Sequence, residues 1–265
     1  MVDGETLVFG VVGDPVRQVR TPGYLNPLFQ ARGRNIICVP LHVSPPDFAT
    51  FWSGVRAQKN LIGLGITVPH KQSAMQHCDS LSASARHLGV VNVVRRQADG
   101  TLHGENFDGQ SFVNGLVREG FDPRGHDIFV FGAGGAAKAI CFALADAGAA
   151  RISIQNRTES KALDLVLALR QDAGFENARA ATGFEASATM VINTSSLGMN
   201  DDDPLPIDPE HLTPGLIVAE VVAKPEVTRL LHAAKEIGCR THSGLHMITN
   251  QMDLIADFIE GADTA

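Results

Sequence analysis

An apolar strand, a glycine-containing turn and the start of a helix follow one another at residues 128–138, in the middle of the 265-residue chain. Gly132, Gly134 and Ala137 match the dinucleotide-binding pattern G-x-G-x-x-G/A. In this pattern the first glycine permits a tight turn, the second lets a pyrophosphate approach the backbone, and the small third residue lets helix and strand pack closely. The helix N-terminus offers N–H groups and the positive end of its dipole to the phosphates. The stretch therefore predicts a dinucleotide site.

The segments after this turn alternate between helix and strand. Their hydrophobic patterns predict a helix that Gly148 ends, strands at 151–155, 190–193 and 216–222, and helices at 160–171 and 226–237. A strand–helix–strand order requires crossover connections, so we expect a parallel, doubly wound sheet.

The first half of the chain predicts a second α/β region. Apolar runs indicate strands at 7–12, 36–43 (broken by Pro40), 61–68 (stopped by Pro69) and 89–94, the last paired with 101–104, and helices at 46–57 and 107–120. Redox enzymes commonly hold the substrate in one domain and the cofactor in another, with the site in the crevice between them. We therefore expect the substrate domain to precede the nucleotide domain.

The composition is that of an ordinary soluble globular protein, with 44% hydrophobic and 19% charged residues. The net charge of −7 argues against non-specific nucleic-acid binding, which needs a basic surface. No apolar run reaches the roughly eighteen residues of a membrane span, and the N-terminus lacks a basic region followed by an apolar signal core. We expect a cytoplasmic protein with neither nucleic acid nor membrane as a partner.

A metal site is not expected either. The four cysteines are widely spaced and form no C-x-x-C pair, which argues against a disulfide and against zinc. His242 and His246 stand four residues apart, but Ser243 and Gly244 argue against a helix there and no acidic ligand adjoins them.

The residues after the strand at 151–155 predict NADP rather than NAD. In dinucleotide folds an acidic residue at this place bonds the ribose 2′-hydroxyl of NAD, whereas an arginine accommodates the 2′-phosphate of NADP. Here the strand ends in Gln155-Asn156-Arg157-Thr158, without an acid. Arg157 can offer a planar charged fork to the phosphate, and Asn156 and Thr158 can add neutral hydrogen bonds. In the alternative interpretation, Thr158 caps the next helix and Arg157 is solvated.

Lys71 and Asp108 stand out as candidates for proton transfer. Lys71 follows an apolar strand that ends in Thr67-Val68-Pro69-His70, and Asp108 opens a helix. Each has an ordinary alternative, because lysines beside prolines are usually solvated and an aspartate in the first turn usually serves the helix dipole.

The order of short motifs along the chain resembles the shikimate dehydrogenase family. The matching segments are Gly13-Asp14-Pro15, Thr67-Val68-Pro69-His70-Lys71, Leu88-Gly89-Val90-Val91-Asn92, Asn106-Phe107-Asp108-Gly109, Gly132-Ala133-Gly134-Gly135-Ala136-Ala137, Asn156-Arg157-Thr158, Ile192-Asn193-Thr194-Ser195-Ser196 and Gly244-Leu245-His246-Met247-Ile248-Thr249-Asn250-Gln251. Together they span nearly all of the sequence.

The resemblance implies a two-domain enzyme of aromatic amino acid biosynthesis. Its substrate-binding and catalytic domain would comprise residues 1–106, with a C-terminal helix at 240–265 returning to it, and its Rossmann domain for NADP would comprise residues 107–239. The implied reaction is reversible hydride transfer between NADP(H) and shikimate or a close cyclic hydroxy acid.

The resemblance also implies roles for individual residues. Lys71 and Asp108 would form the catalytic pair, which can relay the hydroxyl proton. Thr21, Thr67, Asn92 and Gln251 would bind the substrate, together with Asp108. The implied cofactor-binding residues are Gly132, Ala133, Gly134, Gly135, Ala136, Asn156, Arg157, Thr158, Thr194 and Gly244.

The substrate site departs from the family pattern at three positions. The segment that resembles the carboxylate-binding motif H-S-x-S-P reads Gln18-Val19-Arg20-Thr21-Pro22, so Val19 replaces a hydroxyl donor while Thr21 keeps one. Gly65 stands where an asparagine is expected, and Ala223 where a tyrosine is expected. Each lost hydrogen bond to a charged group is worth roughly 1.5–3 kcal/mol. Arg17 or Arg20 could instead meet a carboxylate, or both could be solvated.

Three functions therefore remain open at this point. The first is a dehydrogenase acting on shikimate, and the second applies the same chemistry to another cyclic polyol or hydroxy acid, such as a quinate- or aminoshikimate-like compound. The third is a regulatory protein that binds NADP without turnover, against which the Lys71–Asp108 pair counts. The sequence leaves both a monomer and a homodimer open.

Overall fold

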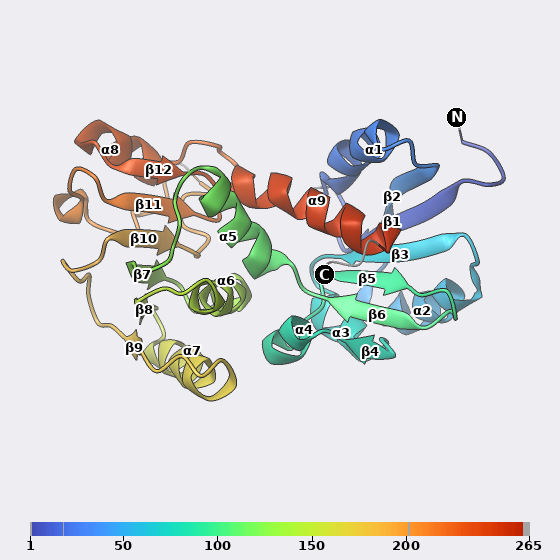
Figure 1. The fold of residues 1–265 in the computed structure, drawn as a ribbon, viewed down its shortest axis with the longest axis horizontal. Coiled ribbons are helices and arrows are strands. Elements are labelled where there is room, and N and C mark those ends of the chain that lie inside the picture. Colours follow the sequence, from blue (N-terminus) through green and yellow to red (C-terminus); the bar gives the residue numbers. More distant parts are fainter. Residues whose placement is uncertain (1, 18, 201, 262–265) are drawn as a thin grey trace. The chain divides into compact units, whose positions relative to one another are not determined.

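The computed structural model describes residues 2–17, 19–200 and 202–261. Gln18, the first residue of the segment compared with the carboxylate motif, and the last four positions of the expected C-terminal helix lie outside the described residues. The chain divides into two compact units, 1–107 together with 252–265 (unit 1) and 108–251 (unit 2). Each unit contains a six-stranded sheet with helices packed on it, so the expected two-domain α/β fold is confirmed (Figure 1).

Unit 1 is built on a mixed sheet of strand order β2-β1-β3-β5-β6-β4. Its strands are β1 (Leu7–Gly13), β2 (Ile36–His42), β3 (Leu61–Ile66), β4 (Ser80–Leu81), β5 (Val93–Arg96) and β6 (Leu102–Glu105). The first three strands are parallel to one another, whereas β5 runs antiparallel to both β3 and β6. The carboxyl ends of β1 and β3 therefore meet at one edge of the sheet.

Pro40 does not break the second strand, contrary to the sequence-based expectation. It pairs with Val11 inside β2, which continues to His42. Strand β2 is an edge strand, and a proline is tolerated there because the missing N–H faces away from the neighbouring strand.

The helices of unit 1 cover this sheet and close its edge. They are α1 (Thr21–Ala31), η1 (Pro45–Asp47), α2 (Phe48–Ala57), α3 (Lys71–Met75) and α4 (Ala83–Leu88). Phe48, Trp52 and Val55 recur at helical spacing on α2 and pack into the core with Leu64 and Val94 of the sheet. Helix α4 was not expected, and Gly89, expected in a strand, ends it in the left-handed conformation.

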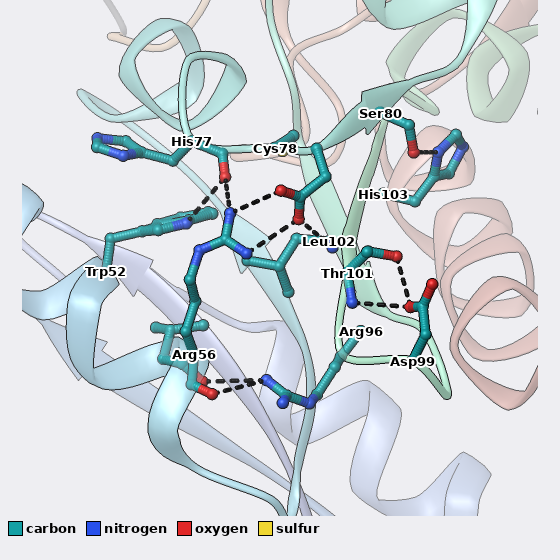
Figure 2. Close-up of polar contacts among 12 residues, drawn as sticks. Trp52, Arg56, His77, Cys78, Ser80, Arg96, Asp99, Thr101, Leu102 and His103 are labelled. Carbon is teal, nitrogen blue, oxygen red and sulfur yellow. Dashed lines mark hydrogen bonds and ion pairs between the residues drawn. The ribbon is translucent and has the colours of Figure 1, made fainter.

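A polar network ties α2 to the far end of the β5–β6 pair (Figure 2). The Arg56 guanidinium donates to both carboxylate oxygens of Asp79, at 3.0 and 3.1 Å, and to the carbonyl of His77. Asp79 also accepts a hydrogen bond from the backbone N–H of Leu102, at 2.7 Å. These bonds link α2 to the segment before β4 and to the start of β6.

Unit 2 has an entirely parallel sheet of order β12-β11-β10-β7-β8-β9. Its strands are β7 (Asp127–Phe131), β8 (Arg151–Gln155), β9 (Ala178–Ala180), β10 (Met190–Asn193), β11 (Ile217–Glu220) and β12 (Arg240–His242). The chain moves outward from β7 to β9 and then returns to the other side of β7 as β10. The order therefore reverses between β7 and β10, which is where such sheets bind dinucleotides.

The helices of unit 2 are α5 (Asp108–Arg118), α6 (Gly135–Asp146), α7 (Glu159–Asp172), η2 (Pro209–His211) and α8 (Arg229–Ile237). Helices α5 and α6 approach closely at Gly109, where a Cβ atom would lie 2.1 Å from the carbonyl oxygen of Ala139. That contact fixes the start of α5, and with it Asp108.

The last described helix, α9 (Leu245–Glu260), contributes to both units, because the division falls between Gln251 and Met252. Within unit 1, Arg32 forms ion pairs with Asp253 and Asp257 on this helix, at 3.2 and 2.6 Å. None of the helices that the structure describes is long and apolar enough to cross a bilayer.

Candidate functional site

Thr67 and Lys71 lie at the edge of the unit 1 sheet where β1 and β3 end. The N–H of Thr67 donates to the carbonyl of Val12, and the carbonyl of Thr67 accepts from the N–H of His70. This turn leads into α3, whose first residue is Lys71. A Cβ atom at Gly13 would lie 2.5 Å from Cγ2 of Thr67, so only glycine allows β1 and this turn to approach so closely.

His70 anchors the turn that carries Lys71, a role that the motif did not predict. Its ring is 1% exposed and stacks on Phe48, with centroids 4.4 Å apart and planes 9° apart. Its Nε2 lies 2.7 Å from the carbonyl oxygen of Val43. In the sequence, His70 is marked only by its position between Pro69 and Lys71. A histidine at such a position would usually be expected to be exposed, so its burial could not be predicted.

Asn92 joins the same edge through its backbone and its side chain. Its carbonyl accepts from the N–H of Ile66 at 2.7 Å, and its Oδ1 accepts from the N–H of Phe107 at 3.0 Å. The neighbouring N–H of Val91 donates to the carbonyl of Lys71. The structure thus brings Thr67, Lys71 and Asn92 together within unit 1.

Two further positions compared with the family pattern lie in α1 and β3 of the same unit. Thr21 is the first residue of α1, directly after the half-buried Val19 and the exposed Arg20. Gly65 is buried inside β3, where a Cβ atom would make only ordinary contacts with Val11 and Phe9, at 3.4 and 3.5 Å. Its lack of a side chain is therefore not enforced by packing.

Asp108 and Gln251 meet within unit 2. The Nε2 of Gln251 donates to Oδ1 of Asp108 at 3.0 Å. Asp108 opens α5, and Gln251 lies on α9. One candidate catalytic residue and one candidate substrate-binding residue are therefore in direct contact, whereas Lys71 belongs to unit 1.

The glycine turn after β7 has the geometry that a phosphate site requires. Gly132 has a φ of 112°, and a Cβ atom there would lie 2.6 Å from Oγ1 of Thr194. Thr194 is held in place because its N–H and its hydroxyl both donate to the carbonyl of Phe131, at 2.8 and 2.7 Å. Gly134 and Gly135, in contrast, have open space where a Cβ atom would point. The N-terminus of α6 is thus exposed, as an approaching phosphate requires.

An open groove of about 360 Å³ adjoins this turn. Ala133, Gly134 and Gly135 line it together with Lys138 of α6 and Lys161 of α7. The two lysines were missed by the sequence reasoning, although both fall within the first turns of helices that follow the expected cofactor segments. Their charges suit an anionic ligand.

The segment expected to select NADP lies between β8 and α7. Asn156 Nδ2 donates to the carbonyl of Thr158 at 2.8 Å, and Arg157 is exposed. Thr158 occupies the N-cap position of α7, but its side chain makes no capping hydrogen bond. The expected capping hydrogen bond of Thr158 is therefore absent, whereas the exposed Arg157 agrees with the alternative interpretation.

Gly244 has a packing role of its own. A Cβ atom there would lie 2.4 Å from the carbonyl group of Val221, so the chain between β12 and α9 can pass the end of β11 only as glycine. Ala223 is half-buried two residues further along the Val221 segment. His242 ends β12 while His246 lies in α9, and their rings are 4.8 Å apart. Among the described residues no group of three or more potential ligands could hold a metal ion.

Comparisons of the sequence and of the structure with known proteins point to the same family. Residues 11–94 match the family model of the shikimate dehydrogenase substrate binding domain. The chain is 35% identical to shikimate dehydrogenase (NADP(+)) of Moorella thermoacetica, over 94% of this chain and 86% of that protein. A shikimate dehydrogenase crystallised with NADP+ superposes with a TM-score of 0.92 at 28% identity, covering 99% of this chain and 92% of that one. The 5-ketofructose reductase of Gluconobacter sp. strain CHM43 superposes with a TM-score of 0.88 at 31% identity, covering 97% of this chain and 93% of that one.

Proposed function

Because the chain belongs to the shikimate dehydrogenase family, we propose that it is an NADP-dependent oxidoreductase that interconverts shikimate and 3-dehydroshikimate. The observation that carries this proposal is the 35% identity to a shikimate dehydrogenase (NADP(+)) along 94% of the chain. Residues 1–107 with the end of α9 form the substrate domain in this proposal, and unit 2 forms the Rossmann domain. The expected membership of the family is confirmed.

The residues of unit 2 fit NADP. The turn at Gly132, the open space at Gly134 and Gly135, and the exposed start of α6 suit a pyrophosphate. Arg157 and Lys161 supply positive charge for the 2′-phosphate, with Asn156 and Thr158 as hydrogen-bonding neighbours. When bound, the cofactor accepts or returns the electron pair of the alcohol–ketone interconversion.

Lys71 and Asp108 handle the proton of the reaction in this proposal. Oxidation of an alcohol releases the hydroxyl proton, and reduction of the ketone returns it. The side chain of Gln251 donates to Oδ1 of Asp108, which orients the carboxylate for its part in the proton transfer. The Lys71 ammonium can polarise the ketone oxygen in the reverse direction.

Substrate hydroxyls are held by Thr67, Asn92 and Gln251, with Thr21 at the carboxylate. The side chains of these residues can all donate or accept hydrogen bonds. Val19, Gly65 and Ala223 cannot, so the site offers fewer polar groups than the family pattern does.

A second candidate is the same reaction on a keto-polyol that carries no carboxylate. The similarity to a 5-ketofructose reductase, at 31% identity over 97% of the chain, favours it, together with Val19 at a carboxylate position. A ligand without a carboxylate would not need the missing donors.

We place the protein in the cytoplasm, as a monomer or a homodimer. The four cysteines are free, and three of them are buried. Free thiols of this kind are typical of a reducing compartment.

An NADP-linked assay over shikimate, quinate, an amino-substituted analogue, an analogue lacking the carboxylate and a keto-polyol tests both candidates. We expect shikimate to have the highest kcat/KM; a marked preference for the keto-polyol would favour the second candidate. Lys71→Ala should lower kcat/KM by roughly 10²–10⁴-fold while NADPH binding stays unchanged. Lys59→Ala, at an exposed lysine of the same unit, is the control. A near-normal rate for Lys71→Ala would refute the catalytic role.

A further inference from the structure

Glu220, the last residue of β11, is buried with the Thr228 hydroxyl and the Asn193 amide near its carboxylate, but without a hydrogen bond of ordinary geometry. The residue is 0% exposed, and among the described atoms neither carboxylate oxygen has a hydrogen-bond partner. Burial raises the pKa of Glu220 to about 7, and the nearby Thr228 hydroxyl and Asn193 amide offset only part of that effect. A buried carboxyl in this condition requires an explanation, because most buried polar groups are paired.

The polar side chains nearest Glu220, Asn193 and Thr228, each make hydrogen bonds to other residues. Asn193, which lies in register with Glu220 on β10, accepts from the N–H and the hydroxyl of Ser195 and donates to the carbonyl of Leu197. Thr228 accepts from the N–H of Leu231 as the N-cap of α8. Its side chain also contacts Gly198, where a Cβ atom would lie 3.4 Å away.

The segment 193–198 leads directly to the glycine turn. Thr194 follows Asn193 and is bonded to the carbonyl of Phe131, and its hydroxyl fills the space beside Gly132. On the other side of Glu220, Val221 donates to the carbonyl of Asn193 and packs against Gly244. Glu220 therefore adjoins two segments that carry expected cofactor-binding residues, Thr194 on one and Gly244 on the other.

We propose that Glu220 is a positioning residue for the cofactor, whose neutral carboxyl lets the segment 193–198 close against Gly132. A neutral carboxyl can remain buried at modest cost. An ionised one gains by reaching water, which requires the segments above it to open. Opening would withdraw Thr194 from Gly132 and weaken cofactor binding. The inference rests on the proposed function through the NADP site.

The charged groups on the surrounding segments do not pair with Glu220. Arg229, at the start of α8, donates to the carbonyl of Asp203. The Asp203 carboxylate accepts from the N–H groups of Gly198 and Asn200, and the Asn200 contact lowers its pKa, so it stays ionised near neutral pH. Lys224 and Glu226 are exposed on the connection after β11. His242 faces the opposite side of the sheet, because it lies in register with Ala219 rather than Glu220.

The test is the dissociation constant of NADPH, measured by fluorescence between pH 6 and pH 8.5 for the wild type, Glu220→Gln and Glu226→Gln. Glu226→Gln is the matched control for the loss of one exposed carboxylate. Variants are compared at each pH, because the 2′-phosphate of the ligand titrates near pH 6 like other phosphomonoesters. We expect the ratio of the wild-type to the Glu220→Gln dissociation constant to rise about tenfold across this range. Glu226→Gln should follow the wild type.

Parallel profiles for all three proteins would overturn the inference and leave the proposed function intact. Failure of the wild type to bind NADPH at any pH would overturn both. Glu220→Met is a second neutral variant and should also be insensitive to pH. Failure of both neutral variants to fold would contradict the inference, since it assigns the closed state to a neutral side chain. In steady-state assays the pH effect should fall on KM for NADPH rather than on kcat.

Discussion

Two buried side chains of unit 2 give opposite pH dependences of stability. Burial lowers the pKa of His242 to about 4 and raises that of Glu220 to about 7. The unfolded chain binds more protons at His242 between about pH 4 and 6.5, so that residue makes stability rise with pH in this window. The folded chain binds more protons at Glu220 between about pH 4.5 and 7, so that residue makes stability fall. The two contributions largely cancel where the windows overlap.

Replacing His242 should reveal its contribution. The residue is 0% exposed, its ring contacts Phe112 and Phe121, and among the described atoms its nitrogens have no hydrogen bond of ordinary geometry, although the backbone of Gly115 lies close and offsets a small part of the pKa shift. In His242→Leu the penalty for protonating a buried imidazole disappears. We expect the free energy of unfolding of this variant, relative to the wild type, to rise by about 3 kcal/mol between pH 6.5 and pH 4. Urea denaturation at several pH values measures this difference.

His232→Leu is the control for that experiment, because His232 is exposed and, among the described residues, its ring pairs with the exposed Glu236. A constant difference between His242→Leu and the wild type across the pH range would contradict the prediction. Such a result would mean that protonation of His242 in its buried site does not lower the free energy of unfolding.

The candidate site could be predicted only in part from its residues. The turn at Gly132 was assigned from spacing, because phosphate binding constrains backbone positions that only glycine tolerates. Lys71 and Asp108 could not be assigned in this way, since a lysine after a proline and an aspartate in a first helical turn both have ordinary roles. Their assignment came from the family resemblance. Glu220 was missed because nothing in the sequence shows that a strand-ending glutamate is buried and unpaired.

Among the elements, two interior strands of unit 2, β8 and β10, were predicted with their observed bounds, whereas β11 is shorter than the predicted strand at 216–222. Strands β8 and β10 are short apolar runs between clear turn residues, and both lie inside the sheet. The edge strands β9 and β12 have three residues each, too few to show a period. Helix α1 was missed because it contains Gly23 and Pro27, which usually argue against a helix. Its packing against β2 outweighs those local preferences.

The hydrogen bonds of Asp79 lead to a prediction about how α2 and the β5–β6 pair are held together. Asp79→Ala removes two hydrogen bonds from Arg56 and leaves the N–H of the buried Leu102 without its acceptor. Because both ionic side chains are more than one-third exposed, the ion pair itself contributes little. We expect a loss of about 1 kcal/mol in the free energy of unfolding, mostly from the backbone N–H, with kcat unchanged. Thermal denaturation measures the loss.

Asp99→Ala is the matched control in the same hairpin, since the side-chain bonds of Asp99 to described residues go to Thr101 in a solvent-exposed turn. It should cost less stability than Asp79→Ala. An equal loss in both variants would mean that the hairpin, rather than the tie to α2, is what Asp79 supports.

At the scale of the whole molecule, two separate cores predict a local response to the cofactor. A ligand that binds only the folded state stabilises it by about 2.7 kcal/mol at a concentration one hundred times Kd. The expected NADP-binding residues at 132–136, 156–158 and 194 belong to unit 2. We therefore expect NADP+ to slow hydrogen exchange most in peptides that cover these positions, and least in peptides around Phe9 and Leu64 in the core of unit 1. Arg157→Ala, which removes the charge expected at the 2′-phosphate, should abolish the difference at the same NADP+ concentration. Equal protection of both cores in the wild type would show that the cofactor stabilises the whole chain as one cooperative unit. That result would contradict the prediction that the two units respond separately.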